Sequence, residues 1–169
     1  RDMPVPVRNT GFTLIELMTV VALLAILAGL AGPSLRTFID NQRLRNGSFD
    51  MVSDLMLARS EGLTRQAPII VTPTSTDSEG WSAGWTVTVG GNPLASRTSL
   101  ASNLRFAVKN SAGTSLGSLG FGPDGRVTEL LTPVRIEVKY ADPAPAGISP
   151  SCIRMDATGR PKADKGACS

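Results

Sequence analysis

The sequence predicts an α+β protein in which a long N-terminal helix packs on an antiparallel β-sheet head. Residues 12–32 form an apolar run whose one charged residue is Glu16. Helical spacing continues from Ser34 to about Gln66. After Pro68 the pattern changes to short β-branched segments that are separated by Gly and Pro turns. A helix followed by consecutive strands is typical of an α+β domain.

The first element is the apolar run, which predicts a membrane-spanning helix over residues 12–32. At about 1.5 Å per residue a helix of this length spans roughly 30 Å, the thickness of a bilayer's hydrocarbon core. Pro33 follows at once and is expected to end or kink the helix. A buried core helix would show an opposite polar face, which is lacking. A cleaved secretory signal would be shorter and end in a small-residue site, which residues 29–33 fit poorly.

The second element is the helix predicted over residues 33–67, whose apolar face is expected to pack on the sheet. That face contains Leu44, Phe49, Val52, Leu55, Met56 and Leu63. The remaining residues, 68–169, are expected to form the β-rich head. We predict strands at residues 69–72, 85–89, 104–109, 119–121, 134–140 and 152–155, with a further segment at 126–131 after a Gly-Pro-Asp-Gly turn.

The composition argues against an enzyme. Seventeen Lys and Arg against fourteen Asp and Glu give a net charge of +3, and there is no histidine. Without histidine there can be no Ser-His-Asp or Cys-His catalysis and no His-containing zinc site, and two cysteines cannot build a four-thiolate site. No phosphate-binding Gly-Lys-Ser/Thr loop or recognisable nucleophile motif occurs. We therefore expect no catalytic residue, no metal and no cofactor.

The two cysteines, Cys152 and Cys168, are an even pair near the C-terminus. In an oxidising compartment a bridge between them would contribute roughly 3 kcal/mol in the chain-entropy model. The alternative is a pair of buried thiols in a cytosolic protein. We favour the disulfide and a head outside the cytoplasm.

Glu16 is the anomaly of the apolar run. A carboxylate at the centre of a spanning helix costs about 2.5–3.5 kcal/mol on insertion scales, and less near an end. One explanation is tolerance, because Glu16 is close to the boundary and can extend toward water. The other is a partner charge: a cut after Gly11 would give Phe12 a free α-ammonium group, which could neutralise Glu16 on a neighbouring subunit.

The run Gly11-Phe12-Thr13-Leu14-Ile15-Glu16, joined to an uninterrupted apolar helix, resembles the processing signature of type IV pilins and type II secretion pseudopilins. The resemblance implies that residues 1–11 are a leader on the cytoplasmic side, removed by a membrane aspartyl prepilin peptidase that cuts between Gly11 and Phe12. It also implies N-methylation of Phe12, a role for Glu16 in docking, and a single-pass inner-membrane subunit with a periplasmic head. The implied partners are other pilin subunits and membrane lipid, and the destination is a pilus or pseudopilus filament.

Three further motifs resemble the FimT/FimU and GspH group of minor pilins. They are Ala58-Arg59-Ser60-Glu61, Gly80-Trp81-Ser82-Ala83-Gly84-Trp85 and Phe121-Gly122-Pro123-Asp124-Gly125. Physically, the two tryptophans are expected to pack in the core or at its rim. Arg59 and Glu61 are expected to be helix-surface charges.

The group leaves three functions to consider: a minor subunit that primes pilus assembly, an H-type pseudopilin for protein export, and DNA binding. DNA binding is suggested by the C-terminal cations Arg154, Arg160, Lys162 and Lys165. Gly159-Arg160-Pro161-Lys162 resembles the Gly-Arg-x-Arg motif of DNA-binding FimT-type pilins, with Lys162 keeping the charge but not the bidentate geometry of arginine. No aromatic residue interleaves the cations, so base stacking is not expected. The alternative is a solvated surface loop closed by the disulfide.

Overall fold

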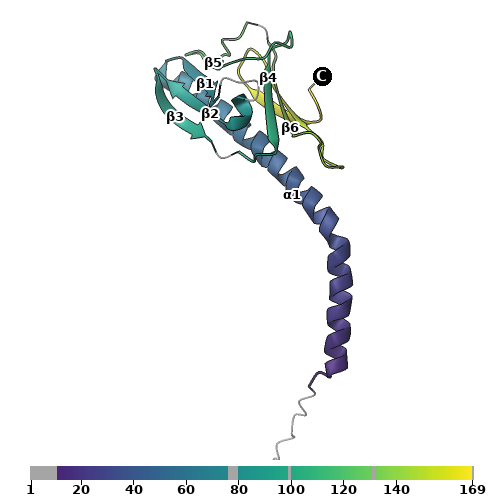
Figure 1. The fold of residues 1–169 in the computed structure, drawn as a ribbon. Helices are drawn as coiled ribbons and strands as arrows, with labels where there is room; N and C mark the ends of the chain where they lie inside the picture. Colours follow the sequence, from purple (N-terminus) through teal and green to yellow (C-terminus); the bar gives the residue numbers. More distant parts are fainter. Residues whose placement is uncertain (1–10, 76–79, 99, 131, 169) are drawn as a thin grey trace, which may run out of the picture. The chain divides into compact units, whose positions relative to one another are not determined.

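A computed structural model describes residues 11–75, 80–98, 100–130 and 132–168, without the side chains of residues 30–33. The expected leader, residues 1–11, lies outside this part except for Gly11. The fold is the predicted α+β class, a long N-terminal helix and an antiparallel head (Figure 1). The chain forms two compact units, residues 1–36 and 37–169.

The helix α1 runs from Leu14 to Arg65, so it does not end at Pro33. Gln66, with a φ of 53°, follows its last residue. No single helix in the described part of the chain meets the length and hydropathy criteria for a membrane span. Two segments of α1, Leu14–Gly29 and Ser34–Arg65, meet those criteria only as a pair. The break between them covers Pro33, where a kink was expected.

The buried face of the second half of α1 matches the predicted one only in part: Leu44 and Leu55 are buried as predicted. Its buried apolar residues are Leu44, Met51, Leu55 and Ala58. Phe49 and Met56, which were expected to pack on the sheet, are 71% and 54% exposed. Leu63 is also exposed, and Val52 is only partly buried. The rest of the face was missed because small residues, among them Gly47 and Ser48, are also buried at this contact.

The head contains two four-stranded antiparallel sheets. The first has the order β3-β2-β1-β5 and the second the order β4-β6-β7-β8. Their strands are β1 (Ile69–Pro73), β2 (Trp85–Val89), β3 (Asn92–Arg97), β4 (Leu104–Lys109), β5 (Leu119–Phe121), β6 (Val134–Tyr140), β7 (Ser151–Met155) and β8 (Pro161–Lys165). A short 3-10 helix, η1 (Gly80–Ala83), precedes β2.

The strand predictions are mostly confirmed, with three corrections. β2, β4, β5 and β6 have the predicted bounds, whereas β3 and β8 were not predicted. β3 begins Asn-Pro and β8 begins with proline, so neither resembles a typical strand. Among the described residues of the predicted segment 126–131, which are 126–130, there is no strand; Val127 makes an isolated bridge to Phe121.

The core lies between α1 and the two sheets. Trp85 of β2 and Phe106 of β4 belong to different sheets and meet edge to face, with ring centroids 5.3 Å apart. Trp85 is fully buried, and Trp81 is nearly so, with its indole Nε1–H donating to the Leu116 carbonyl at 2.7 Å. Both tryptophans therefore pack the core, as the sequence predicted.

Two polar clusters connect α1 to the sheets. In the first, the buried Asp54 accepts hydrogen bonds from Trp85 Nε1 at 2.9 Å and from Arg97 Nε at 3.1 Å, and Arg97 Nη2 donates to its second oxygen at 3.1 Å. The hydrogen bond to Asp54 raises the pKa of the Arg97 guanidinium above its usual value. One carboxylate on α1 thus holds both β2 and β3.

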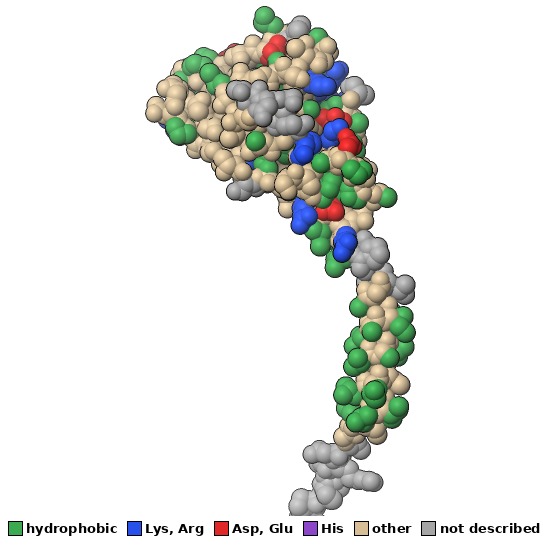
Figure 2. Space-filling model, viewed as in Figure 1, with side chains coloured by type: hydrophobic (Ala, Val, Ile, Leu, Met, Phe, Trp, Pro, Cys, Tyr) green, Lys and Arg blue, Asp and Glu red, His purple; other side chains and the backbone are tan. Residues whose placement is uncertain are grey.

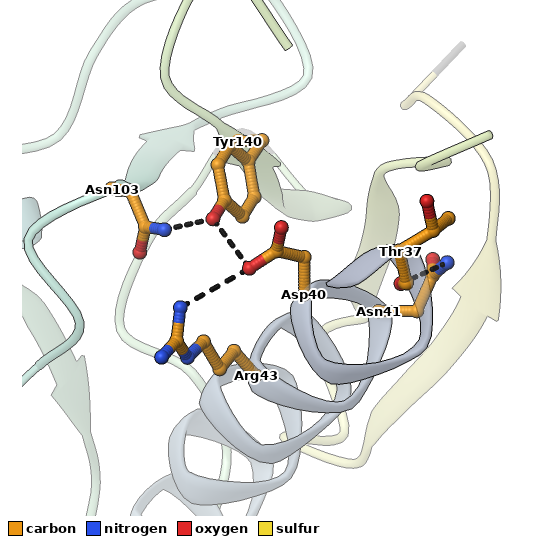
Figure 3. Close-up of polar contacts among 6 residues, drawn as sticks. All are labelled: Thr37, Asp40, Asn41, Arg43, Asn103 and Tyr140. Atoms are coloured by element: carbon orange, nitrogen blue, oxygen red, sulfur yellow. Dashed lines mark hydrogen bonds and ion pairs between the residues drawn. The ribbon is translucent and has the colours of Figure 1, made fainter. Parts of the chain in front are cut away.

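The second cluster connects α1 to β6 (Figure 3). The Tyr140 hydroxyl donates to Asp40 Oδ1 at 2.7 Å, and Arg43 Nη1 lies 3.1 Å from the same oxygen. Asn103 donates to the Tyr140 hydroxyl. Burial, followed by the hydrogen bond to Asp40, raises the pKa of Tyr140 above its ordinary value of 10.0. The clusters hold different sheets, so both sheets are attached to the helix by charge as well as by apolar contact.

Candidate functional site

The residues predicted for processing and assembly, Gly11, Phe12 and Glu16, lie close together in the sequence and are exposed to solvent. Gly11 and Phe12 precede α1 and are exposed, Phe12 to 85%. Thr13 caps the helix: its side-chain oxygen accepts from the Glu16 N–H at 3.3 Å, and its carbonyl accepts from the Leu17 N–H at 3.2 Å. The three residues assigned to processing and assembly therefore flank a helix start. Glu16 lies in the first turn, where the helix dipole favours a negative charge.

The first turns of α1 expose an unusual amount of apolar surface, visible as the green side chains of the helical segment in Figure 2. The large exposed residues are Leu14, Ile15, Leu17, Met18, Val20, Val21, Leu23, Leu24, Ile26 and Leu27. Monomeric soluble proteins rarely expose a contiguous apolar surface of this extent, so this segment requires a lipid or protein environment.

The C-terminal cations lie on a hairpin and not in the alternative surface loop. β7 and β8 pair from Met155↔Pro161 to Ser151↔Lys165, and Cys152 is joined to Cys168 by the disulfide. Arg154 lies directly opposite Lys162, and both are exposed. Lys165 faces the other way and lines a groove of about 480 Å³ beside α1. The four predicted cations are thus divided between two faces.

Arg160 occupies the connection between β7 and β8, outside both strands. In this connection Asp156 accepts hydrogen bonds from the side chain and backbone of Thr158, at 2.5 and 2.9 Å. These bonds, together with the charges of Arg160 and Arg126, lower the pKa of the Asp156 carboxyl below its ordinary value. Arg160 therefore has an acidic neighbour.

Three of the sequence motifs, those that contain Arg59, Gly125 and Gly159, come together at one junction of the head. Gly159, with a φ of 73°, is so tightly placed that an added Cβ would lie 2.4 Å from the Gly125 carbonyl oxygen and 3.4 Å from Arg59 Cδ. Arg59 Nε donates to the Thr158 carbonyl at 3.1 Å. An added Cβ at Gly62 would lie 2.9 Å from the Gly122 carbonyl oxygen. The glycines of these motifs therefore serve close backbone packing between α1, the turn after β5 and the β7–β8 connection.

The Gly80–Trp85 motif packs against β4 and against Thr74, which follows β1. Ser82 Oγ accepts from the Phe106 N–H at 2.9 Å, and the Gly84 carbonyl accepts from the Thr74 N–H at 2.9 Å. An added Cβ at Gly84 would lie 2.0 Å from the Arg97 carbonyl oxygen. This motif, too, is explained by packing. Among the described residues, no group of three His, Cys, Asp or Glu side chains could hold a metal ion.

A long helix that begins at a capped, exposed apolar segment and ends in an antiparallel head defines the class of pilin-like subunits. The chain belongs to the family of the type II transport protein GspH, whose family model matches residues 50–159. The prokaryotic N-terminal methylation motif matches residues 7–32. The chain is therefore a minor pilin- or pseudopilin-type subunit that carries a membrane-anchoring N-terminal segment.

Two kinds of solved structure share the fold. A crystal structure of the type IV minor pilin FimU of Pseudomonas aeruginosa has a TM-score of 0.58 and 17% identity, over 75% of this chain and 92% of that one. The minor pseudopilin EpsH of the type 2 secretion system of Vibrio cholerae has a TM-score of 0.53 and 12% identity, over 75% of this chain and 98% of that one. No curated protein matches the sequence. At these identities the likeness concerns the fold.

Proposed function

We propose that this protein is a minor type IV pilin of the FimT/FimU kind, which primes or joins pilus assembly. The observation that carries the proposal is the capped helix start, where Phe12 and Glu16 stand one turn apart at the end of an exposed apolar helix. In the proposed pathway prepilin peptidase cuts between Gly11 and Phe12, and Phe12 is N-methylated. The apolar helix is held in the inner membrane and later packs among other pilin helices, while the head is periplasmic.

A GspH-type pseudopilin of the type II protein secretion system is the alternative. It would use the same N-terminal chemistry and the same fold. The buried tryptophan pair favours neither alternative because both rings serve the core. A deletion strain separates the two: the pilin proposal expects loss of sheared surface pili with exoprotein secretion intact. Retained pili, with exoproteins trapped in the periplasm, would assign the protein to secretion.

The proposed role of Glu16 in assembly gives a specific test. Glu16→Val should leave cleavage after Gly11 intact but reduce filament incorporation at least about tenfold, because a docking charge on the apolar helix is lost. Glu61→Val is the matched control: it removes a carboxylate from the same helix, but one that pairs with Arg65 within the head. Immunoblots of sheared filaments and whole cells measure both steps. Normal incorporation of the Glu16 variant would contradict the docking role.

DNA binding is a second proposed function, supported by the position of Arg154 opposite Lys162 on the exposed face of β7 and β8. Two strands hold these side chains side by side, whereas a loop would leave them mobile. Phosphate contacts by a few cations give a weak, salt-sensitive attraction of the kind that an uptake subunit would use. Gel retardation of a DNA duplex at low salt tests it, and wild-type protein that leaves the duplex unretarded would exclude this function.

A further inference from the structure

Four cations lie in one cross-strand row on the sheet formed by β4, β6, β7 and β8. The strand register places Lys109 opposite Arg135, Arg135 opposite Arg154, and Arg154 opposite Lys162. We propose that this row binds the phosphodiester backbone of a nucleic acid, so that the DNA surface is a sheet face that extends beyond the C-terminal tail to β4 and β6. The inference rests on the second proposed function and gives it a site.

The four side chains share the outer face of the sheet. The alternating residues of β4 and β6, such as Val108, Val134 and Ile136, are buried against the core, as are Ile153 and Met155 of β7. Because successive side chains on a strand point to opposite faces, the cations between them point outward. On β8, Lys162 is the cross-strand neighbour of Arg154 and belongs to the same face.

Like charges directly opposite one another destabilise a sheet, so an uninterrupted row of four is unfavourable for the isolated head. The row is only partly compensated. Lys162 Nζ lies 3.6 Å from Asp164 Oδ1. Within the described residues the structure gives no ion pair or hydrogen bond to the side chains of Lys109, Arg135 or Arg154. Strands lie about 4.8 Å apart, well inside the screening length of about 8 Å at physiological salt, so the four charges act together.

The dimensions of the row suit a chain of phosphates. Three strand spacings give a length of about 14 Å. With both strands counted, duplex DNA carries one phosphate about every 1.7 Å along its axis, so a row of this length has at least four phosphates within reach. A cavity of about 110 Å³ opens at one end of the row; its lining includes Lys109, Arg135, Glu137 and Cys168. Phosphate oxygens can therefore approach the first two cations from the solvent side.

The surroundings of the row favour a narrow polyanion over a flat anionic surface. The adjacent row on the same face contains two carboxylates, Glu137 and Asp164. In this row Glu137 lies opposite Ala107 and Cys152, and Cys152 lies opposite Asp164. A membrane or an acidic protein surface would meet these carboxylates as well as the cations, whereas a phosphodiester strand that follows the row contacts the cations. No aromatic side chain lies among the outward residues of these strands, so recognition is of the backbone and independent of sequence.

The test compares two double variants on the same strands. Lys109→Gln with Arg135→Gln removes half of the row, and Arg105→Gln with Lys139→Gln is the control. The control pair is also in register on β4 and β6 and makes the same charge change. Binding of a labelled DNA duplex of random sequence to the full chain in non-ionic detergent is measured by anisotropy between about 50 and about 200 mM salt. Circular dichroism checks that each variant is folded, and Arg154→Gln provides an independent third variant.

Four neutralised phosphates predict a slope of log K against log salt of about −3.6, and the row variant should reduce it to about −1.8. Its affinity at low salt should fall about tenfold, and the control pair should stay near wild type. Equal losses in the two pairs would overturn the row in favour of general charge attraction. Loss of binding in Arg160→Gln with Lys165→Gln, but not in the row variant, would overturn the row while leaving DNA binding in place. No binding by the wild type would refute both.

Discussion

The buried carboxylate of Asp54 should be among the strongest single contributors to the stability of the head. The substitution Asp54→Ala removes the acceptor of the Trp85 indole N–H and leaves that buried donor unsatisfied, which costs about 1–3 kcal/mol. It also removes the two hydrogen bonds from Arg97. Because the Arg97 side chain is 38% exposed and can turn to water, their loss adds only about 0.5–1 kcal/mol. The expected total is about 1.5–4 kcal/mol.

The assay is urea unfolding of the full chain, followed by the fluorescence of Trp81 and Trp85, which report on the core of the head. For a domain of this size the loss corresponds to a fall in melting temperature of about 10 °C. Asp50→Ala is the matched control, since Asp50 lies on the same helix and pairs with the same arginine at 3.4 Å, but it is a partly exposed carboxylate. The control should lose about 0.5 kcal/mol or less.

Asp54→Asn separates the two contributions, because its amide oxygen can still accept from Trp85 while the ion pair with Arg97 is lost. It should be less destabilised than Asp54→Ala. If Asp54→Ala unfolds within about 1 kcal/mol of wild type, or no earlier than Asp50→Ala, the assignment of Asp54 as the anchor of β2 and β3 is refuted.

Two further predictions concern the motif junction and the Tyr140 cluster. Gly159→Ala should lose at least about 2 kcal/mol more stability than the control Gly113→Ala in the same urea unfolding assay. Both glycines have a positive φ, so both substitutions carry the backbone cost. Only at position 159 does an added Cβ also meet the Gly125 carbonyl oxygen. Similar losses in the two variants would contradict the close packing of the junction. The folded-state pKa of Tyr140 is raised above 10.0, so its contribution is fully present below pH 10 and is lost as the pH rises through the folded-state value. Tyr140→Phe should therefore lose less stability than wild type between about pH 9 and about pH 11, and parallel losses would count against the cluster.

Elements with a strong local pattern could be predicted from the sequence. β6 alternates apolar and charged residues over its whole length, and its predicted and observed bounds agree. β3 and β8 contain proline, alanine and charged residues, and they are strands because of tertiary pairing with β2 and β7. A one-residue register irregularity between Val87 and Thr88 further weakens the local signal of the β2–β3 hairpin.

The contact face of α1 was misread for a related reason. Counting large apolar residues selected Phe49 and Met56, but the close approach of the sheets is made at small residues. At Gly47 an added Cβ would lie 2.9 Å from Leu104 Cδ1, so the sheet packs directly on the backbone there. A helix whose buried face mixes Gly, Ser and Ala with a few large apolar residues has a weak apolar pattern, so only part of that face could be predicted from the sequence.

The candidate sites are also of two kinds: one is a continuous sequence motif, and the other is assembled by the fold. Gly11, Phe12 and Glu16 form a contiguous motif, which the sequence displays directly. Arg154 and Lys162 were named as cations from a basic tail, but Lys109 and Arg135 are far away in the sequence. Only the register between β4, β6 and β7 brings them into one row.

The disulfide has a consequence for how subunits crowd together in a filament or membrane. β8 is one of the two edge strands of its sheet, and unpaired edges invite strand exchange between neighbouring copies. Because Cys152 of β7 is bonded to Cys168 beyond the end of β8, the edge strand is held in a covalent loop. A domain swap that exchanges β8 alone would require this bond to open. The disulfide therefore opposes domain swapping of β8, so that neighbouring heads can be in contact at high local concentration and each keep its own edge strand.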